Sequence, residues 1–452
     1  MTAVPTRPSA TTGAPRLRRL DLAATDAASI AERTALCRRG ASPDEGVRTA
    51  TRSILDDVRA RGAAAVRDAN ERFGGGLADE RLVIERAELR AARDALSRED
   101  RAALDQAIAH VRRFAEPQLP VTTRTEIIQG IEIERRWRPL DRVGCYVPGG
   151  SAPYPSSLVM TVIPARVAGV GAIVVASPAG ADGTMHPVLL GAAGLLEVDV
   201  LLVAGGAQAI GALAFGLDEL PAVDRIVGPG NAWVTAAKLE VAGFVGIDLP
   251  AGPSEGMVLA DDRADPVLVA ADLATQAEHG PDSPALLVTT SPELADAVEA
   301  EIARLLPRLE RREILARALA VHGRIALAPD VATALAFVDA YAPEHLSIDV
   351  GDSEAAVDAI HNAGSIFVGP WAPESAGDYA SGANHVLPTG GLARACNPLG
   401  VEAFGRFSQV QRVDQRGLAA IRTTVERLAT VEGLTAHRNA ITARFDPPRS
   451  GR

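Results

Sequence analysis

Side chains that could bind a metal ion are concentrated in a few segments of the chain. Gln276 and His279 stand three residues apart in a segment with helical spacing, so both project from one face of a helix. An aspartate and a second histidine from distant segments would complete a site of nitrogen and oxygen donors. For any one such residue, a surface or helix-capping role is the alternative. Four histidines lie in segments crowded with other reactive side chains: Gln276-Ala-Glu-His279, Pro343-Glu344-His345, Asp378-Tyr-Ala-Ser-Gly-Ala-Asn384-His385 and Glu432-Gly-Leu-Thr-Ala-His437.

An adjacent glutamate and histidine could supply acid–base catalysis. Glu344 and His345 can both transfer protons near neutral pH when their surroundings tune their pKa values. Their adjacency would let them serve two different steps at one carbon. Such pairs also occur by chance, so the spacing alone does not assign the role.

Glycine-rich turns follow several of the apolar segments. Gly228-Pro-Gly230-Asn231 precedes a helical segment, but Trp233 replaces the third glycine of a dinucleotide-binding fingerprint. A tight strand-to-helix turn is therefore the alternative to a pyrophosphate site. The turns at residues 148–157 and 205–209 could also hold phosphate or ribose through backbone N–H groups near helix starts.

The elements that must position these residues follow an alternating pattern. Residues 42–114 have helical spacing, and short runs rich in Val and Ile then alternate with Ala-rich helical segments, which is typical of parallel, buried sheets. Two such series predict two α/β units, followed by a polar, helical segment after Asn397. The predicted strands are 143–147, 172–176, 198–204, 225–227, 245–249, 256–260, 285–289, 324–328 and 365–368.

Composition excludes several classes of protein. The net charge is −11, and no basic stripe with interleaved aromatic residues occurs, so neither nucleic acid nor an anionic membrane is an expected partner. The three cysteines, Cys37, Cys145 and Cys396, are far apart, which argues against a disulfide framework and favours the reducing cytoplasm. No secretory signal is predicted at the N-terminus. Cys145 could attack an aldehyde, but it lies in an apolar run where a buried, inert cysteine is expected.

Eight segments resemble the histidinol dehydrogenase family, in the order in which that family has them. The resemblance covers roughly Leu20 to Phe445. The segments are Gly144-Cys-Tyr-Val-Pro-Gly-Gly-Ser-Ala-Pro-Tyr-Pro-Ser-Ser157, Gly228-Pro-Gly-Asn231, Pro250-Ala-Gly-Pro-Ser254-Glu, Gln276-Ala-Glu-His279, Ala342-Pro-Glu344-His345-Leu, Gly377-Asp378-Tyr, Asn384-His385-Val-Leu-Pro-Thr389 and Glu432-Gly-Leu-Thr-Ala-His437.

The resemblance implies roles for individual residues. The implied zinc ligands are Gln276, His279, Asp378 and His437, and the implied catalytic pair is Glu344 and His345. The implied substrate contacts are Ser254, Gln276, His279, His345, Asp378, His385, Glu432 and His437. The implied NAD contacts are Tyr146, Gln208 and Asn231.

The family also implies a fold of the α/β class, with two incomplete Rossmann-like units containing parallel sheets, plus extended helical N- and C-terminal segments. It implies a homodimer with shared active sites, in which Glu432 and His437 reach the site of the other copy. The expected division is a disordered lead at 1–16, an N-terminal arm at 17–41, a first α/β unit with the zinc and catalytic residues at 42–123 and 254–396, an NAD-binding unit at 124–253, a C-terminal helical dimerisation segment at 397–445 and a disordered tail at 446–452.

The implied reaction is a two-step, four-electron oxidation of L-histidinol to L-histidine through the aldehyde, with one Zn²⁺ per subunit and two NAD. It is the last step of histidine biosynthesis. Residues 393–401 lack the Ser-Gly-Leu-Ser-Val run expected in the family, which leaves another amino alcohol or a sulfonated diol open as the substrate. A zinc hydrolase could use the same ligands with Glu344 activating water, but it would not need nucleotide contacts.

Overall fold

The computed structural model describes residues 16–149 and 152–445. The predicted disordered lead, apart from Arg16, and the predicted disordered tail lie outside these residues. The chain divides into a larger unit, Met1–Gln118 with Leu140–Phe404, and a smaller unit, Leu119–Pro139 with Gly405–Arg452. Within the described part, no helix is both long and apolar enough to cross a membrane.

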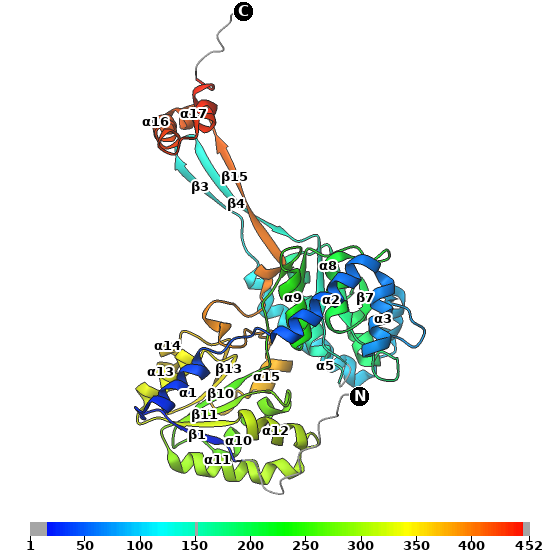
Figure 1. The fold of residues 1–452 in the computed structure, drawn as a ribbon, viewed down its shortest axis with the longest axis vertical. Helices are drawn as coiled ribbons and strands as arrows, with labels where there is room; N and C mark the ends of the chain where they lie inside the picture. The colour runs from blue at the N-terminus through cyan, green and yellow to red at the C-terminus, as the bar shows by residue number, and fades with distance from the viewer. Residues whose placement is uncertain (1–15, 150–151, 446–452) are drawn as a thin grey trace, which may run out of the picture. The chain divides into compact units, whose positions relative to one another are not determined.

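The first sheet of the larger unit has six strands, all parallel. Both faces are covered by helices, which is why its central strands read as continuous apolar runs (Figure 1). Its order is β1 (Arg18–Asp21), β12 (Arg324–Leu327), β11 (Ala285–Thr289), β10 (Gly256–Ala260), β13 (His345–Asp349) and β14 (Ser365–Val368). One face carries α10 (Pro266–Glu278), α11 (Pro292–Leu305) and α12 (Arg312–His322). The other carries α1 (Ala27–Cys37), α13 (Val331–Tyr341) and α14 (Ser353–Ala359).

The second sheet also has six strands, of which only the edge strand β2 is antiparallel. Its order is β2 (Val83–Glu85), β7 (Val200–Val203), β6 (Ala172–Ser177), β5 (Arg142–Tyr146), β8 (Arg225–Val227) and β9 (Gly246–Ile247). The helices around it are α2 (Glu45–Arg61), α3 (Ala63–Phe73), α4 (Arg86–Asp94), α5 (Arg98–Ala115), α6 (Pro155–Ala168), α7 (Pro187–Leu195), α8 (Gly206–Phe215) and α9 (Ala232–Val241). The remaining short helices of the unit are α15 (Glu374–Tyr379) and the 3₁₀ turns at Glu116–Gln118, Leu306–Arg308, Leu392–Arg394 and Val401–Phe404.

Each sheet contains five parallel strands in the order of a Rossmann unit. The orders are β12-β11-β10-β13-β14 and β7-β6-β5-β8-β9. In each set of five, the first strand in sequence, β10 or β5, is central, and the order of strands reverses beside it. The predicted α/β class with two Rossmann-like units is thereby confirmed.

The helices that precede the second sheet in the chain do not belong to the unit in which they were predicted. Residues 42–123 were expected to join the unit with the metal site, but Leu55 and Val58 of α2 share a core with Ile210 and Leu213 of α8. Strand β2 likewise extends the second sheet. Helical spacing shows that a face is buried, but it does not show which sheet buries it.

The smaller unit is an antiparallel sheet of three strands with a pair of helices. The sheet order is β15 (Gly405–Val413), β4 (Ile131–Pro139) and β3 (Thr123–Ile128), and the helices are α16 (Gln415–Val431) and α17 (Thr435–Thr442). The prediction of a helical segment at 397–445 missed β15. Its apolar residues Phe407, Val410 and Val413 recur every third residue, a spacing that favours a helix when read without the partner strand.

Candidate active site

The end of α10 places the first two predicted metal ligands. Gln276 lies in its last turn with 1% of its surface exposed, and His279 is the C-cap residue. Because α10 follows β10 and runs back along the sheet, its last turn returns to the amino edge of the strands. Gly256 opens β10 there, and a Cβ on it would lie 2.8 Å from Gln276 Oε1. A glycine at this position is what lets the amide pack over the start of the strand.

The predicted acid–base pair lies at the same edge. β13 begins at His345, which stands in register with Gly256 on β10. The His345 N–H donates to the carbonyl of Glu255 at 3.2 Å. The side chains of His345 and Glu344 are 4% and 7% exposed. Adjacent parallel strands therefore bring the pair beside the end of α10.

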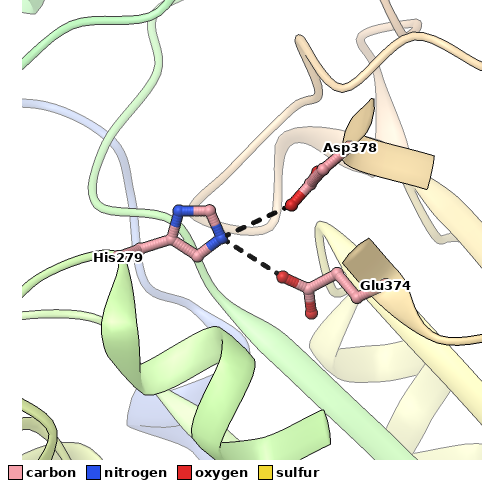
Figure 2. Close-up of side chains that lie close together, drawn as sticks. All are labelled: His279, Glu374 and Asp378. Carbon is pink, nitrogen blue, oxygen red and sulfur yellow. Dashed lines mark hydrogen bonds and ion pairs between the residues drawn. The ribbon is translucent and has the colours of Figure 1, made fainter. Parts of the chain in front are cut away.

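Two carboxylates from α15 complete the cluster. Glu374 and Asp378 stand one helical turn apart, and Figure 2 shows both pointing at the His279 ring. His279 Nε2 lies 3.3 Å from Glu374 Oε1 and 3.9 Å from Asp378 Oδ2. One possible ligand atom from each of the three residues falls within 4.8 Å of the others. His345 reaches the same group, with Nδ1 3.8 Å from Glu374 and Nε2 3.9 Å from Asp378.

The cluster has the donors that a zinc ion needs. Among the described residues, Gln276 Oε1 and both ring nitrogens of His345 are buried without a hydrogen-bond partner. Buried polar atoms are ordinarily paired, so atoms of this kind at one site indicate a ligand. An amide oxygen, an imidazole and a carboxylate, from Gln276, His279 and Asp378, form a set of nitrogen and oxygen donors that fits zinc.

A chain of hydrogen bonds joins Gln276, a predicted metal ligand, to Glu344 of the predicted acid–base pair. Gln276 Nε2 donates to Ser254 Oγ at 3.2 Å, and Ser254 Oγ donates to Glu344 Oε2 at 2.9 Å. The backbone N–H of Glu255 donates to the same Glu344 oxygen at 2.8 Å. Two donors therefore fix the carboxylate, and the predicted contact residue Ser254 lies between Glu344 and Gln276.

The surroundings raise the pKa values of both members of the pair. Burial raises the pKa of Glu344 to about 7, although the positive charge of His345 opposes the rise. Burial lowers the pKa of His345, but the carboxylates of Glu374, Glu344 and Asp378 outweigh that effect, so the net shift is upward. For His279, burial is likewise outweighed by Glu374, and its pKa rises to about 9. Acid and base forms of Glu344 are thus both accessible near neutral pH.

Glu374 is a site residue that the sequence reasoning missed. It is 3% exposed and contacts both His279 and His345, yet no predicted role fell on it. Its spacing carried a signal, because it stands four residues before Asp378 and therefore shares a helix face with a predicted ligand.

His385 lies at the edge of the cluster, and the substrate contact that the resemblance implies for it stays a prediction. Its Nδ1 is 3.0 Å from the Asp378 carbonyl oxygen, and its Nε2 is 3.2 Å from Ser157 Oγ at the start of α6. Burial lowers the pKa of His385 to about 4, so its ring is neutral. It is placed to orient the loop after α15.

Glu432 and His437 belong to the smaller unit. Glu432 is the C-cap residue of α16 and His437 lies in α17, and both are exposed. All residues of the cluster described above belong to the larger unit. A role for Glu432 and His437 as contacts or ligands stays a prediction.

The three predicted NAD contacts lie at the carboxyl edge of the second sheet. Tyr146 ends β5, Gln208 lies in the first turn of α8 after β7, and Asn231 caps α9 after β8. Ligands of open α/β sheets bind at this edge, beside the reversal of strand order. Asn231 Oδ1 accepts hydrogen bonds from the backbone N–H groups of Trp233 and Val234, so this turn is a capped helix start.

A buried ion pair holds the turn before Asn231. Gly228 has φ 114°, and a Cβ on it would lie 2.1 Å from the Tyr146 carbonyl oxygen. Lys238 Nζ donates to the Gly228 carbonyl at 3.1 Å, and the Gly228 N–H donates to Asp248 Oδ2 at 2.7 Å. Lys238 and Asp248 also form an ion pair, with both side chains 2% exposed. Hydrogen bonds to both the carbonyl and the N–H of Gly228 therefore stabilise the turn.

Cys145 lies in β5, away from the first sheet, and is fully buried. Burial raises the pKa of its thiol to about 12, which leaves almost no thiolate at neutral pH. This agrees with the expectation that Cys145 is inert.

Comparison with known proteins identifies the family to which the chain belongs. The family model for histidinol dehydrogenase matches residues 37–445. A histidinol dehydrogenase of Leifsonia xyli subsp. xyli is 48% identical over 88% of this chain and 92% of its own length. One of Methanosarcina barkeri is 42% identical over 92% of this chain and 96% of its own. The crystal structure of histidinol dehydrogenase from Elizabethkingia anophelis superposes with a TM-score of 0.87 at 34% identity, covering 95% of this chain and 98% of that one. The chain therefore belongs to the histidinol dehydrogenase family and is an NAD-dependent oxidoreductase.

Proposed function

We propose that the chain oxidises L-histidinol to L-histidine through the aldehyde, in two hydride-transfer steps that use zinc and two NAD. This would be the last step of histidine biosynthesis. The observation that carries the proposal is the burial of Glu344 and His345 beside Gln276, His279 and Asp378, whose donors fit zinc, with a pKa of about 7 for Glu344. The family names and the nucleotide-binding edge of the second sheet support the redox chemistry.

Gln276, His279 and Asp378 would hold the zinc ion, with His437 supplied by a second copy of the chain. Zinc has no redox role and, when bound, supplies a fixed template for the imidazole and amine of the substrate, while NAD accepts the hydride. The unpartnered Gln276 Oε1 and the acidic partners of His279 support this arrangement.

His345 would take the hydroxyl proton as the first hydride leaves the alcohol. The buried ring is surrounded by Glu344, Glu374 and Asp378, which stabilise its protonated form. These carboxylates explain why the pKa of His345 rises despite its burial. A histidine set among acids can therefore accept a proton and pass it on.

Glu344 would remove a proton from the water that adds to the aldehyde, before the second hydride leaves. Ser254 and the Glu255 N–H hold one oxygen of the carboxylate. A water molecule supplies the oxygen atom that turns aldehyde into acid, so no thiol nucleophile is needed. That agrees with the inert environment of Cys145.

The test is NADH formation by the zinc-loaded enzyme with a panel of substrates. We expect histidinol and histidinal to be oxidised, and we expect other amino alcohols and sulfonated diols to react far more slowly. Faster oxidation of a diol than of histidinol would show that the substrate is a related alcohol and not histidinol. Hydrolysis of an ester or amide without NADH formation would favour the zinc hydrolase.

A homodimer with shared sites is part of the proposal, because His437 and Glu432 would act in the site of the other copy. Mixing an inactive His437→Ala subunit with an inactive Glu344→Gln subunit would restore one intact site per mixed dimer. Recovery of activity on mixing is the expected result, and no recovery would place His437 in the site of its own subunit or outside the site. The cytoplasmic location stays a prediction.

A further inference from the structure

Arg39 lies two residues after the end of α1, and its side chain reaches Glu255 at the amino edge of the first sheet. Its guanidinium forms an ion pair with Glu255 through both Nη2 and Nε, the latter 2.7 Å from Glu255 Oε2. The two side chains are 16% and 3% exposed. Arg39 Nη1 also donates to the carbonyls of Tyr341 at 2.5 Å and Leu36 at 3.0 Å, and its Cζ lies 3.3 Å from the centre of the Tyr341 ring.

Glu255 connects this ion pair to both proposed catalytic residues. Its backbone N–H donates to Glu344 Oε2 at 2.8 Å, and its carbonyl accepts from the His345 N–H at 3.2 Å. Its side chain accepts from the Gly390 N–H at 3.1 Å, in the loop that follows His385. Arg39 therefore holds a residue whose backbone forms hydrogen bonds with both members of the pair.

The charge of Arg39 matters because two acids are buried side by side. A buried carboxylate is stable only when it is paired, and a second carboxylate nearby favours protonation of one of them. Arg39 contacts both oxygens of the Glu255 carboxylate and so compensates this buried charge beside Glu344. A lysine could supply the charge but not the fork, which here contacts both Glu255 oxygens and several carbonyls.

We infer that Arg39 is a positioning residue for Glu344 and His345, acting through Glu255 at the amino edge of β10 and β13. This inference rests on the proposed roles of Glu344 and His345. Arg39 contacts neither residue directly, so its loss should lower kcat and leave substrate binding largely unchanged.

Arg394 provides a matched control. Its Nη1 donates to the Gly391 carbonyl at 2.9 Å, and its Nη2 donates to the carbonyls of Cys37, at 3.0 Å, and Ala340. Like Arg39, it therefore joins the end of α1 to the end of α13, and it also binds the loop near residue 390, but none of these contacts involves Glu255.

The experiment compares Arg39→Met, Arg39→Lys and Arg394→Met in the zinc-loaded enzyme. For Arg39→Met we expect kcat to fall about tenfold to a hundredfold, the scale for a misplaced catalytic group, with KM for histidinol changed less than about threefold. Arg39→Lys should recover part of kcat, and Arg394→Met should keep it. Zinc content and the midpoint of thermal unfolding, measured beside activity, show whether each variant is folded and loaded.

If kcat falls equally in Arg39→Met and Arg394→Met, Arg39 only holds chain segments together, and the inference is wrong. If Arg39→Met does not fold, Arg39→Lys against Arg394→Lys carries the same comparison. Glu344→Gln is measured in parallel. Full activity of Glu344→Gln would refute the proposed catalytic role of Glu344, whereas a dead Glu344→Gln with a normal Arg39→Met would refute only the role of Arg39.

Discussion

Replacing Glu344 by glutamine should make the protein more stable and less active at the same time. Burial raises the pKa of Glu344 from its ordinary value near 4.5 to about 7 in the folded chain. Folding raises the pKa of such a carboxyl, so ionising it lowers the free energy of unfolding. This loss is absent below the pKa of the unfolded chain and complete above the pKa of the folded chain. The difference of roughly 2.5 pKa units corresponds to about 3 kcal/mol at most.

Glutamine keeps the shape of the side chain and removes that cost. Its amide oxygen can still accept from Ser254 Oγ and from the Glu255 N–H, so the local hydrogen bonds survive. We therefore expect Glu344→Gln to match the parent protein near pH 4.5 and to exceed its free energy of unfolding by up to about 3 kcal/mol at pH 8. The window of change lies between about pH 4.5 and pH 7.

Urea unfolding at pH 5 and pH 8 measures the stability, and single-turnover NADH formation measures the chemistry. Oxidation of histidinal should slow by roughly 10²- to 10⁴-fold, the scale for losing a positioned general base, and oxidation of histidinol should slow less. In the parent enzyme, histidinal oxidation should rise as the pH passes about 7, where Glu344 ionises. A stability difference that is independent of pH would refute the burial argument. Equal losses in both steps would show that Glu344 and His345 act as one unit.

Other perturbations test the remaining assignments. His345→Asn should slow histidinol oxidation more than oxidation of supplied histidinal in single turnovers, because its proposed proton belongs to the alcohol. Cys145→Ala should leave both steps largely intact, and loss of the aldehyde step alone would restore the thiol as nucleophile. Chelation should abolish turnover yet leave the circular dichroism unchanged, because the ligands lie on a packed α/β body, and added zinc should restore activity. Lys238→Met should weaken NAD binding in a titration while zinc content stays constant, because the Gly228 turn loses its ion pair.

Much of the fold could be predicted from the sequence, because buried parallel strands appear as short runs of apolar residues. The runs at 256–260 and 285–289 were predicted with the bounds that β10 and β11 have. β1 and β13 were not predicted, since a strand of four or five residues that mixes polar and apolar side chains leaves little periodicity. β13 mattered most, because its first residue is His345.

The candidate site was predictable where chemistry and spacing coincide. Gln276 and His279 share one helix face, and the structure places them together at the end of α10. Arg39 could not be assigned from local pattern alone, because it acquires its role through contacts between segments far apart in the sequence. Glu374 had a local signal, its spacing from Asp378, but its contacts with His279 and His345 also depend on the fold. The Arg39–Glu255 pair joins residues separated by 216 positions. Such pairs become visible only when the strand order is known.

The strand order also sets constraints on how the chain can fold during synthesis. The second sheet is complete once Ile247 has been made, but β1 at residues 18–21 pairs only with β12 at residues 324–327. At 5–20 residues per second, a ribosome needs about 15 to 60 s to make the roughly 300 residues between them. Among the described residues, the first strand of the chain thus waits for the fourth strand of its own sheet in sequence order. Until it docks, β12 presents an unpaired edge, so a nascent chain that loses β1 should be prone to aggregate through that edge.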